Sequence, residues 1–193
     1  MGFIKQPLSS KQESKIKTDL HLIDQITKVA RADGMRVIIS GGYAVDGFLR
    51  EITRYHNDID IQIYGTEDNA RDVVKGLLNS LSAGVEYAIE DKGRKEYYYN
   101  IVYTSKDTTL DIYYLQTKVS PLGKYKSIIK NDGSISHQEF SEPKFGEIGD
   151  IKFEIQGPEI ELKDKIYKRE VRGDVKRLEH EQDISNLKQK LAI

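Results

Sequence analysis

The sequence predicts an α+β fold in which a mixed β-sheet is flanked by helices and closed by a helical C-terminus. Three patterns carry this prediction. Apolar residues recur at helical spacing from residue 10 to about residue 33. Polar and apolar residues alternate along residues 58–64, as they do in a strand that is buried on one face. After Gly157-Pro158 the chain returns to helical patterns.

Local signals place the remaining elements. Asp33-Gly34 is a natural helix stop, and the β-branched run after it is typical of a short buried strand. A turn at Lys92-Gly93 joins two strands, and residues 116–150 predict irregular structure with short strands. We expect one domain over residues 1–193, with a flexible tail at 1–9 and a C-terminal helical segment at 158–193. The expected strands are 35–39, 58–64, 85–90, 95–103, 109–115 and 151–155, and the expected helices are 10–33, 43–52, 70–81, 159–171 and 175–191.

Composition excludes several classes of protein. The chain has no cysteine, which excludes disulfides, thiolate catalysis and cysteine-based metal sites. Its formal net charge is -1, so no strong field of one sign demands a nucleic-acid or membrane partner. No apolar run approaches the length of a membrane span, and the N-terminus lacks the apolar core of a secretory signal. We therefore expect a cytoplasmic protein with no membrane partner.

A pair of glycines, Gly41-Gly42, lies between a predicted buried strand and a predicted helix. Glycines let the backbone turn tightly and approach a ligand closely. The N-terminus of the following helix offers unpaired N–H groups and the positive end of a dipole, which suit phosphate. By itself this pattern is more often only a turn.

Two carboxylates, Asp58 and Asp60, stand two residues apart on a predicted strand, so their side chains share one face. Like charges this close raise each other's pKa unless a cation lies between them. Magnesium, which prefers carboxylate and phosphate oxygens, is the natural occupant. The alternative is a solvent-facing strand edge with two aspartates that have no function.

A third carboxylate, Asp111, interrupts an apolar strand, where burial without a partner is costly. If that strand lies beside the Asp58 strand, three carboxylates come together and can hold one or two metal ions. Asp111 would also be placed to take a proton from an attacking hydroxyl. An exposed strand residue is the alternative for Asp111.

Taken together, these stretches resemble a known signature. Gly-Gly-Tyr-Ala-Val-Asp at 41–46 and Thr-Arg-Tyr-His-Asn-Asp-Ile-Asp at 53–60 are similar to the signature of the DNA polymerase β-like nucleotidyltransferase superfamily. The likeness is closest to the small enzymes that act on aminoglycosides at the 2″-hydroxyl and on lincosamides. It spans roughly residues 20–190. Further matches are the Leu-Asp at 110–111, the Gly-Pro-Glu start of a helix at 157–159 with Lys165 downstream, and Asp183 of the closing helix, where Asn186 replaces a second aspartate.

The resemblance implies the nucleotidyltransferase fold and a two-metal transfer of AMP from ATP, or from another nucleoside triphosphate, to a hydroxyl. Asp58 and Asp60 would hold two Mg²⁺ ions and the triphosphate, and Asp111 would be a metal ligand, the general base or both. Ser40, Gly41 and Gly42 would cradle phosphate. Lys165 would neutralise a phosphate, with Lys163 as the alternative. Arg54 and His56 match the motif and are expected to hold their loop rather than a ligand.

The acceptor stays open at this stage. A small hydroxyl-bearing molecule, with antibiotics among the candidates, fits the closest motif. A tRNA or protein acceptor, as in some toxins, would need a basic surface, which the cationic stretch 163–177 could supply. A protein of this fold that binds nucleotide without catalysis is the non-enzyme alternative, and both a monomer and a homodimer are compatible. For a cationic acceptor the candidate acidic residues are Glu86, Glu90, Asp91 and Glu96, and the tyrosines at 97–99 and 113–114 are explained by half-buried packing or by stacking.

Overall fold

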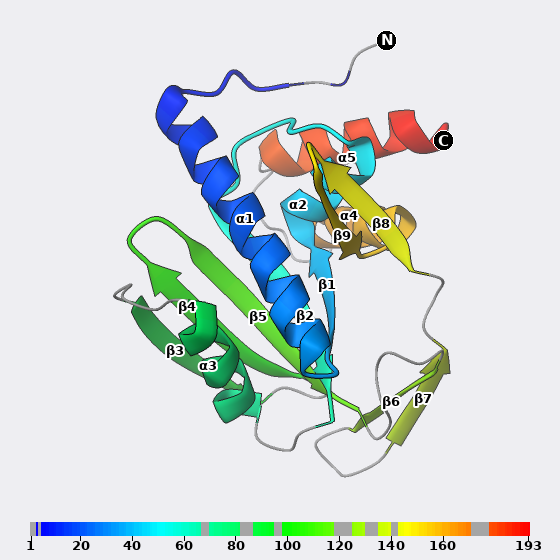
Figure 1. Cartoon of the computed structure of the whole chain (residues 1–193). Coiled ribbons are helices and arrows are strands. Elements are labelled where there is room, and N and C mark those ends of the chain that lie inside the picture. The colour runs from blue at the N-terminus through cyan, green and yellow to red at the C-terminus, as the bar shows by residue number, and fades with distance from the viewer. Residues whose placement is uncertain are drawn as a thin grey trace.

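The computed structural model describes residues 3, 5–66, 70–81, 87–94, 98–117, 125–129, 135–139, 143–170 and 178–193. They form a seven-stranded mixed sheet with helices packed against it, and a separate two-stranded sheet (Figure 1). The helices are α1 Ser10–Ala32, α2 Gly41–Leu49, α3 Ala70–Leu81, α4 Pro158–Glu170 and α5 Leu178–Leu191. The strands are β1 Arg36–Ser40, β2 Asp58–Gly65, β3 Tyr87–Arg94, β4 Tyr99–Ser105, β5 Thr109–Gln116, β6 Tyr125–Ile129, β7 Ile135–Glu139, β8 Lys144–Ile148 and β9 Ile151–Ile155.

The strand order of the large sheet is β3-β4-β5-β2-β1-β9-β8. Strands β2 and β5 run parallel, as do β1 and β9, while the other neighbours are antiparallel. The predicted α+β class with a mixed sheet is therefore confirmed. The β2–β5 register pairs Asp60 with Asp111, and the β1–β2 register pairs Ser40 with Asp60. Three residues from distant parts of the sequence thus meet on adjacent strands.

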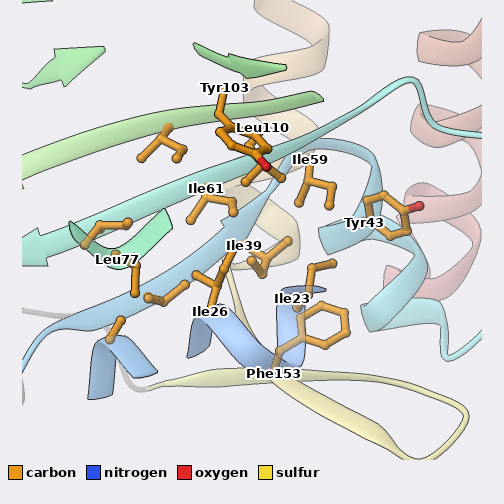
Figure 2. Packing of buried hydrophobic residues seen from close by; sticks show 14 of the residues in the cluster. Ile23, Ile26, Ile39, Tyr43, Ile59, Ile61, Leu77, Tyr103, Leu110 and Phe153 are labelled. Carbon is orange, nitrogen blue, oxygen red and sulfur yellow. The ribbon is translucent and has the colours of Figure 1, made fainter. Parts of the chain in front are cut away.

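The main core lies between the sheet and helices α1 and α3. Ile59, Ile61 and Ile63 of β2 have no exposed surface, as the alternating sequence predicts. Figure 2 shows Ile23 and Ile26 of α1 directed toward this layer of isoleucines. Burying each such side chain contributes about 1.5–3 kcal/mol. Because this face is filled with apolar groups, the aspartates of β2 are directed to the opposite face.

A second core cluster joins the C-terminal helical segment to α2. It consists of Val45 and Leu49 of α2, Leu162 of α4, and Ile184 and Leu187 of α5. Two residues of the expected tail also contact the rest of the fold. The Gln6 amide donates to the Thr53 carbonyl at 2.8 Å, and Leu8 packs against the main core. No helix among the described residues is long and apolar enough to cross a membrane.

The structure differs from the sequence prediction at helix α2 and at Lys92-Gly93. Helix α2 begins at Gly41 rather than residue 43, and it ends at Leu49 rather than residue 52 because Arg50 adopts the left-handed conformation with φ of 61°. The predicted turn at Lys92-Gly93 is wrong: β3 continues to Arg94, and a bulge lies between Asp91 and Gly93. Gly93 uses its positive φ of 76° for this bulge, and its amide donates to Asp91 Oδ1 at 2.8 Å.

Other predicted segments run into parts of the chain outside the described residues. These are the starts of the strand from 85 and of the helix from 175, the first residues of the strand from 95, and much of 116–150. The described residues of 116–150 include the short strands β6, β7 and β8, as expected.

Asp19 of α1 is a buried carboxylate that links three parts of the fold. Its Oδ2 accepts from the Tyr43 hydroxyl of α2 at 2.7 Å, and its Oδ1 accepts from the Thr108 hydroxyl at 2.8 Å. Lys15, one turn earlier, pairs with the same carboxylate. Burial, reinforced by the charge of Asp19, raises the pKa of Tyr43, so the phenol stays protonated and donates.

Replacing Asp19 with Ala should destabilise the fold by about 3 kcal/mol, because it leaves buried hydroxyls and a lysine without their acceptor. Urea denaturation followed by circular dichroism measures this loss. The matched control is Asp24→Ala, whose carboxylate pairs with Lys28 at the surface of the same helix. The control should change the unfolding free energy by no more than about 0.5 kcal/mol. Equal effects of the two variants would contradict a linking role for Asp19.

Candidate active site

The sheet brings the predicted carboxylates to one place. Asp60 of β2 lies directly beside Asp111 of β5, and Asp58 precedes Asp60 by two residues on the same face of the strand. Asp58 is exposed, whereas Asp60 and Asp111 are half-buried. The parallel arrangement of β2 and β5, which the sequence left conditional, is what unites them.

The field at Asp60 is negative. Burial and the charges of Asp58 and Asp111 together raise the pKa of Asp60 to about 6, against the opposing effect of Lys168 and Lys165. A carboxylate in this position is costly to ionise without a cation. The negative charge of the three aspartates therefore favours the binding of a cation.

Two side chains that sequence reasoning missed hold Asp111. Asn100 of β4 donates through Nδ2 to Asp111 Oδ1 at 2.6 Å, and the Tyr113 hydroxyl donates to Oδ2 at 2.6 Å. Burial, with the hydrogen bond to Asp111, raises the pKa of Tyr113, so it remains a donor. The i, i+2 spacing of Tyr113 was a usable signal. Nothing in the sequence pointed to Asn100, because it depends on the β4–β5 register.

The donor set formed by the three aspartates fits Mg²⁺, which takes hard oxygen ligands. The repulsion among them is also of the kind that a divalent cation relieves. Within the described parts of the chain, however, no three acidic or histidine side chains are already gathered closely enough to form a metal-binding cluster. The fit to Mg²⁺ therefore rests on ligand chemistry and charge.

The glycine turn is required by the protein's own packing. Gly41 has φ of 70°, and a Cβ atom placed on it would lie 1.9 Å from Asp60 Oδ2. A Cβ atom on Gly42 would lie 2.2 Å from His56 Nδ1. The Ser40 side chain makes no capping hydrogen bond to α2, whereas the Gly41 amide donates to Glu161 Oε1 at 2.8 Å. Of the three predicted phosphate donors, Gly41 thus already has an acceptor within the protein.

The loop between α2 and β2 is held by the other motif residues. His56 Nε2 lies 2.6 Å from Asp46 Oδ2, and Asp46 Oδ1 accepts from the Thr53 hydroxyl at 2.7 Å. Arg54 makes two hydrogen bonds to the Asp183 carboxylate, at 3.1 and 2.9 Å. All of these groups are buried. Arg54 and His56 are therefore placed to hold the loop, as expected.

The candidate lysines lie in different environments. Lys165 is 5% exposed, and its Nζ lies 2.8 Å from Asp183 Oδ2. Lys163 is exposed. Lys168 is half-buried and pairs with Asp164 at 2.7 Å, and its positive charge acts to lower the pKa of Asp60. Although burial opposes it, the hydrogen bond from Arg54 and the charge of Lys165 hold the pKa of Asp183 below its usual range. Lys168, which no sequence pattern singled out, joins Lys165 as a candidate cation.

The candidate acceptor-binding residues are only partly within the described chain. Glu90 and Asp91 are exposed on β3, and Asp91 accepts from the Tyr99 hydroxyl at 2.5 Å. Tyr98 lies edge-on to Tyr113 with ring centroids 5.3 Å apart, and Tyr114 is buried in the core. Glu86, Glu96 and Tyr97 lie outside the described residues.

The raised pKa of Asp60 gives a stability prediction. The folded value of about 6 exceeds the ordinary value, so the native state binds the extra proton, and stability is lost as pH rises from about 4 through 6. Without divalent metal, Asp60→Asn should therefore be more stable than wild type at pH 7.5 by on the order of 1–3 kcal/mol. The difference should vanish below about pH 4.

Thermal unfolding across pH in the presence of a chelator measures this effect of Asp60→Asn. Asp150→Asn, in the exposed turn between β8 and β9, is the control and should follow wild type at every pH. A destabilised Asp60→Asn protein at pH 7.5 would show that the carboxylate is satisfied in the free protein.

Comparison with protein families finds a match within the first two thirds of the chain. Residues 22–112 match the model of the family described as aminoglycoside-2″-adenylyltransferase. This segment includes the glycine turn and the three aspartates. The comparison with curated proteins finds no match.

Solved structures share the fold at low identity. The crystal structure of ANT(2″)-Ia in complex with adenylyl-2″-tobramycin has a TM-score of 0.58 and 19% identity, over 90% of each chain. The lincomycin-bound lincosamide antibiotic adenylyltransferase LnuA has a TM-score of 0.54 and 20% identity, over 95% of this chain and 98% of that one. A nucleotidyltransferase-like protein from Paracoccidioides brasiliensis has a TM-score of 0.54 and 17% identity, over 96% and 79%. The chain therefore has the fold of these solved nucleotidyltransferase structures and is similar over residues 22–112 to the aminoglycoside-2″-adenylyltransferase family.

Proposed function

We propose that the protein transfers AMP from ATP to a hydroxyl of a small-molecule acceptor, with antibiotics as the favoured class, in a reaction that depends on Mg²⁺. The observation that carries the proposal is the β2–β5 register, which sets Asp60 beside Asp111 next to the glycine turn. A carboxylate cluster and a helix N-terminus at one site can serve metal and phosphate together.

The nucleotide would be bound at the N-terminus of α2. The Ser40 hydroxyl makes no capping bond, and the early amides of a helix have no partner within it. With the Gly41 amide engaged by Glu161, the Ser40 hydroxyl and the Gly42 amide are the donors best placed for phosphate oxygens. Lys165, with Lys168 near it on α4, would add positive charge toward the triphosphate.

Asp58, Asp60 and Asp111 would hold the Mg²⁺ ions. When bound, the metal would neutralise the triphosphate and stabilise the charge that develops on the departing pyrophosphate. The same charge would remove the repulsion that now raises the pKa of Asp60.

Asp111 would act as the general base. The acceptor oxygen forms a bond to the α-phosphorus, the bond from that phosphorus to pyrophosphate breaks, and the hydroxyl proton passes to the Asp111 carboxylate. The hydrogen bonds from Asn100 and Tyr113 fix the orientation of this carboxylate before the acceptor arrives. A base that is already oriented loses little entropy in the reaction.

The acceptor class is supported by likeness and by charge. Two solved structures of the same fold are complexes, one with adenylyl-2″-tobramycin and one with lincomycin. Exposed Glu90 and Asp91 on β3 would favour a cationic acceptor such as an aminoglycoside. A tRNA or protein acceptor and nucleotide binding without transfer are the other outcomes that the assay must separate.

Incubation of the protein with α-labelled nucleoside triphosphates, Mg²⁺ and a panel of aminoglycosides, lincosamides and bulk tRNA tests the proposal. We expect label from ATP on one class of antibiotic and none when a chelator replaces Mg²⁺. Label on RNA or on protein would replace the small-molecule acceptor. Binding of ATP without transfer to any acceptor would favour the non-enzyme alternative.

Asp111→Asn should retain the fold and lower kcat by at least about a hundredfold. The asparagine amide cannot accept the hydroxyl proton, and the proposed metal site loses a negatively charged ligand. Steady-state kinetics on the acceptor found above measures the loss. Asp107→Asn, exposed in the turn that leads into β5, is the control and should retain wild-type kcat. Near-normal kcat in Asp111→Asn would refute the assignment of the base.

A further inference from the structure

Glu161 is a buried carboxylate that contacts the glycine turn. It lies in the first turn of α4 and is only 2% exposed. Its Oε1 accepts a hydrogen bond from the Gly41 amide at 2.8 Å, across 120 positions of sequence. No sequence pattern distinguishes it from the other charged residues of this helix.

The surroundings of Glu161 explain how a carboxylate can be buried there. Its position in the first turn of α4 is favoured by that helix's dipole, and the Gly41 amide belongs to the N-terminus of α2. Lys165, four residues on, shares its face of α4. One carboxylate therefore lies between two positive helix ends and a lysine. Burial still raises the pKa of Glu161 to about 7, against the effects of Lys165 and the Gly41 hydrogen bond.

Gly41 is confined from two sides. Glu161 holds its amide from α4, and the carboxylate of Asp60 lies so close that a Cβ atom on Gly41 would be 1.9 Å from Oδ2. The glycine has φ of 70°, and because glycine adopts positive and negative φ about equally readily, its own backbone preference does not hold the turn in this geometry. Loss of the Glu161 acceptor would release the amide and let the turn move relative to Asp60.

We propose that Glu161 is a positioning residue of the nucleotide site: its carboxylate anchors the Gly41 amide, so that the turn presents the Ser40 hydroxyl and the Gly42 amide to phosphate. This inference rests on the proposed nucleotide site. The hydrogen bond, rather than the charge, performs the anchoring, because a neutral side-chain oxygen accepts from an amide in the same way.

The direction of the change in ATP affinity on removal of Glu161 distinguishes the anchoring role from a competing one. If Glu161 merely occupied the place of a phosphate oxygen, its removal would free the amide and remove a like charge, and ATP would bind more tightly. If Glu161 anchors the turn, its removal displaces the other donors, and ATP binds more weakly.

Isothermal titration with Mg²⁺–ATP should compare Glu161→Met and Glu161→Gln with wild type. Loss of the anchor in Glu161→Met should weaken binding at least about tenfold, whereas Glu161→Gln, which keeps an acceptor oxygen, should stay within about threefold. Glu159→Met is the matched control, since this glutamate lies in the same turn and is exposed. Far-UV circular dichroism establishes that each variant is folded.

Binding by Glu161→Met within threefold of wild type, or tighter, would overturn the positioning role. An equal loss in Glu161→Gln and Glu161→Met would assign the effect to charge and would also overturn it. Hydrogen exchange of the Gly41 amide in wild type gives a readout that needs neither nucleotide nor a folded variant. A protected amide supports the anchor, and an amide that exchanges freely refutes it. If wild type binds no nucleotide, the proposed function fails, while the exchange of Gly41 still reports on the anchor.

Discussion

The parallel pairing of β2 with β5 is the constraint on which the rest of this site depends. Each strand has an apolar face that fills the core and an opposite face that carries aspartates. Because side chains alternate along a strand, a shift of one residue in the register would send Asp111 into the core and separate it from Asp60. The packing of Ile59 and Ile61 against α1 therefore also determines the position of the carboxylates (Figure 2).

A shell of buried ionic contacts supports this cluster. Asp183 of α5 holds Arg54 of the loop and Lys165 of α4 at once, so the C-terminal helices are tied to the loop that leads into β2. Asp46 holds Thr53 and His56 in the same loop. Removing one member of such a buried pair commonly costs about 3–5 kcal/mol, because it strands the other charge. The motif residues of this loop thus hold its geometry through contacts within the protein.

Positive and negative charge are arranged unequally around the glycine turn. Burial and repulsion by Asp58 and Asp111 raise the pKa of Asp60, and Lys168 and Lys165 offset only part of this shift. A second buried carboxylate, Glu161, accepts from the Gly41 amide, where two helix N-termini and Lys165 favour it. The free protein therefore keeps an excess of negative charge at the three aspartates, where a metal ion would neutralise it, and a buried acceptor for the glycine turn.

Periodicity and local chemistry in the sequence determined the class of fold, the paired aspartates and the glycine turn, because each of these signals lies within a few neighbouring residues. They did not determine the bulge at Gly93. Lys92-Gly93 is equally typical of a turn, and the structure instead has the Gly93 amide bonded to the Asp91 side chain within β3. Only the tertiary structure decided that Asn100 orients Asp111 and that Glu161 holds Gly41. Such partners come from strands or helices far apart in the chain, and their meeting depends on register and helix packing, which no local pattern encodes.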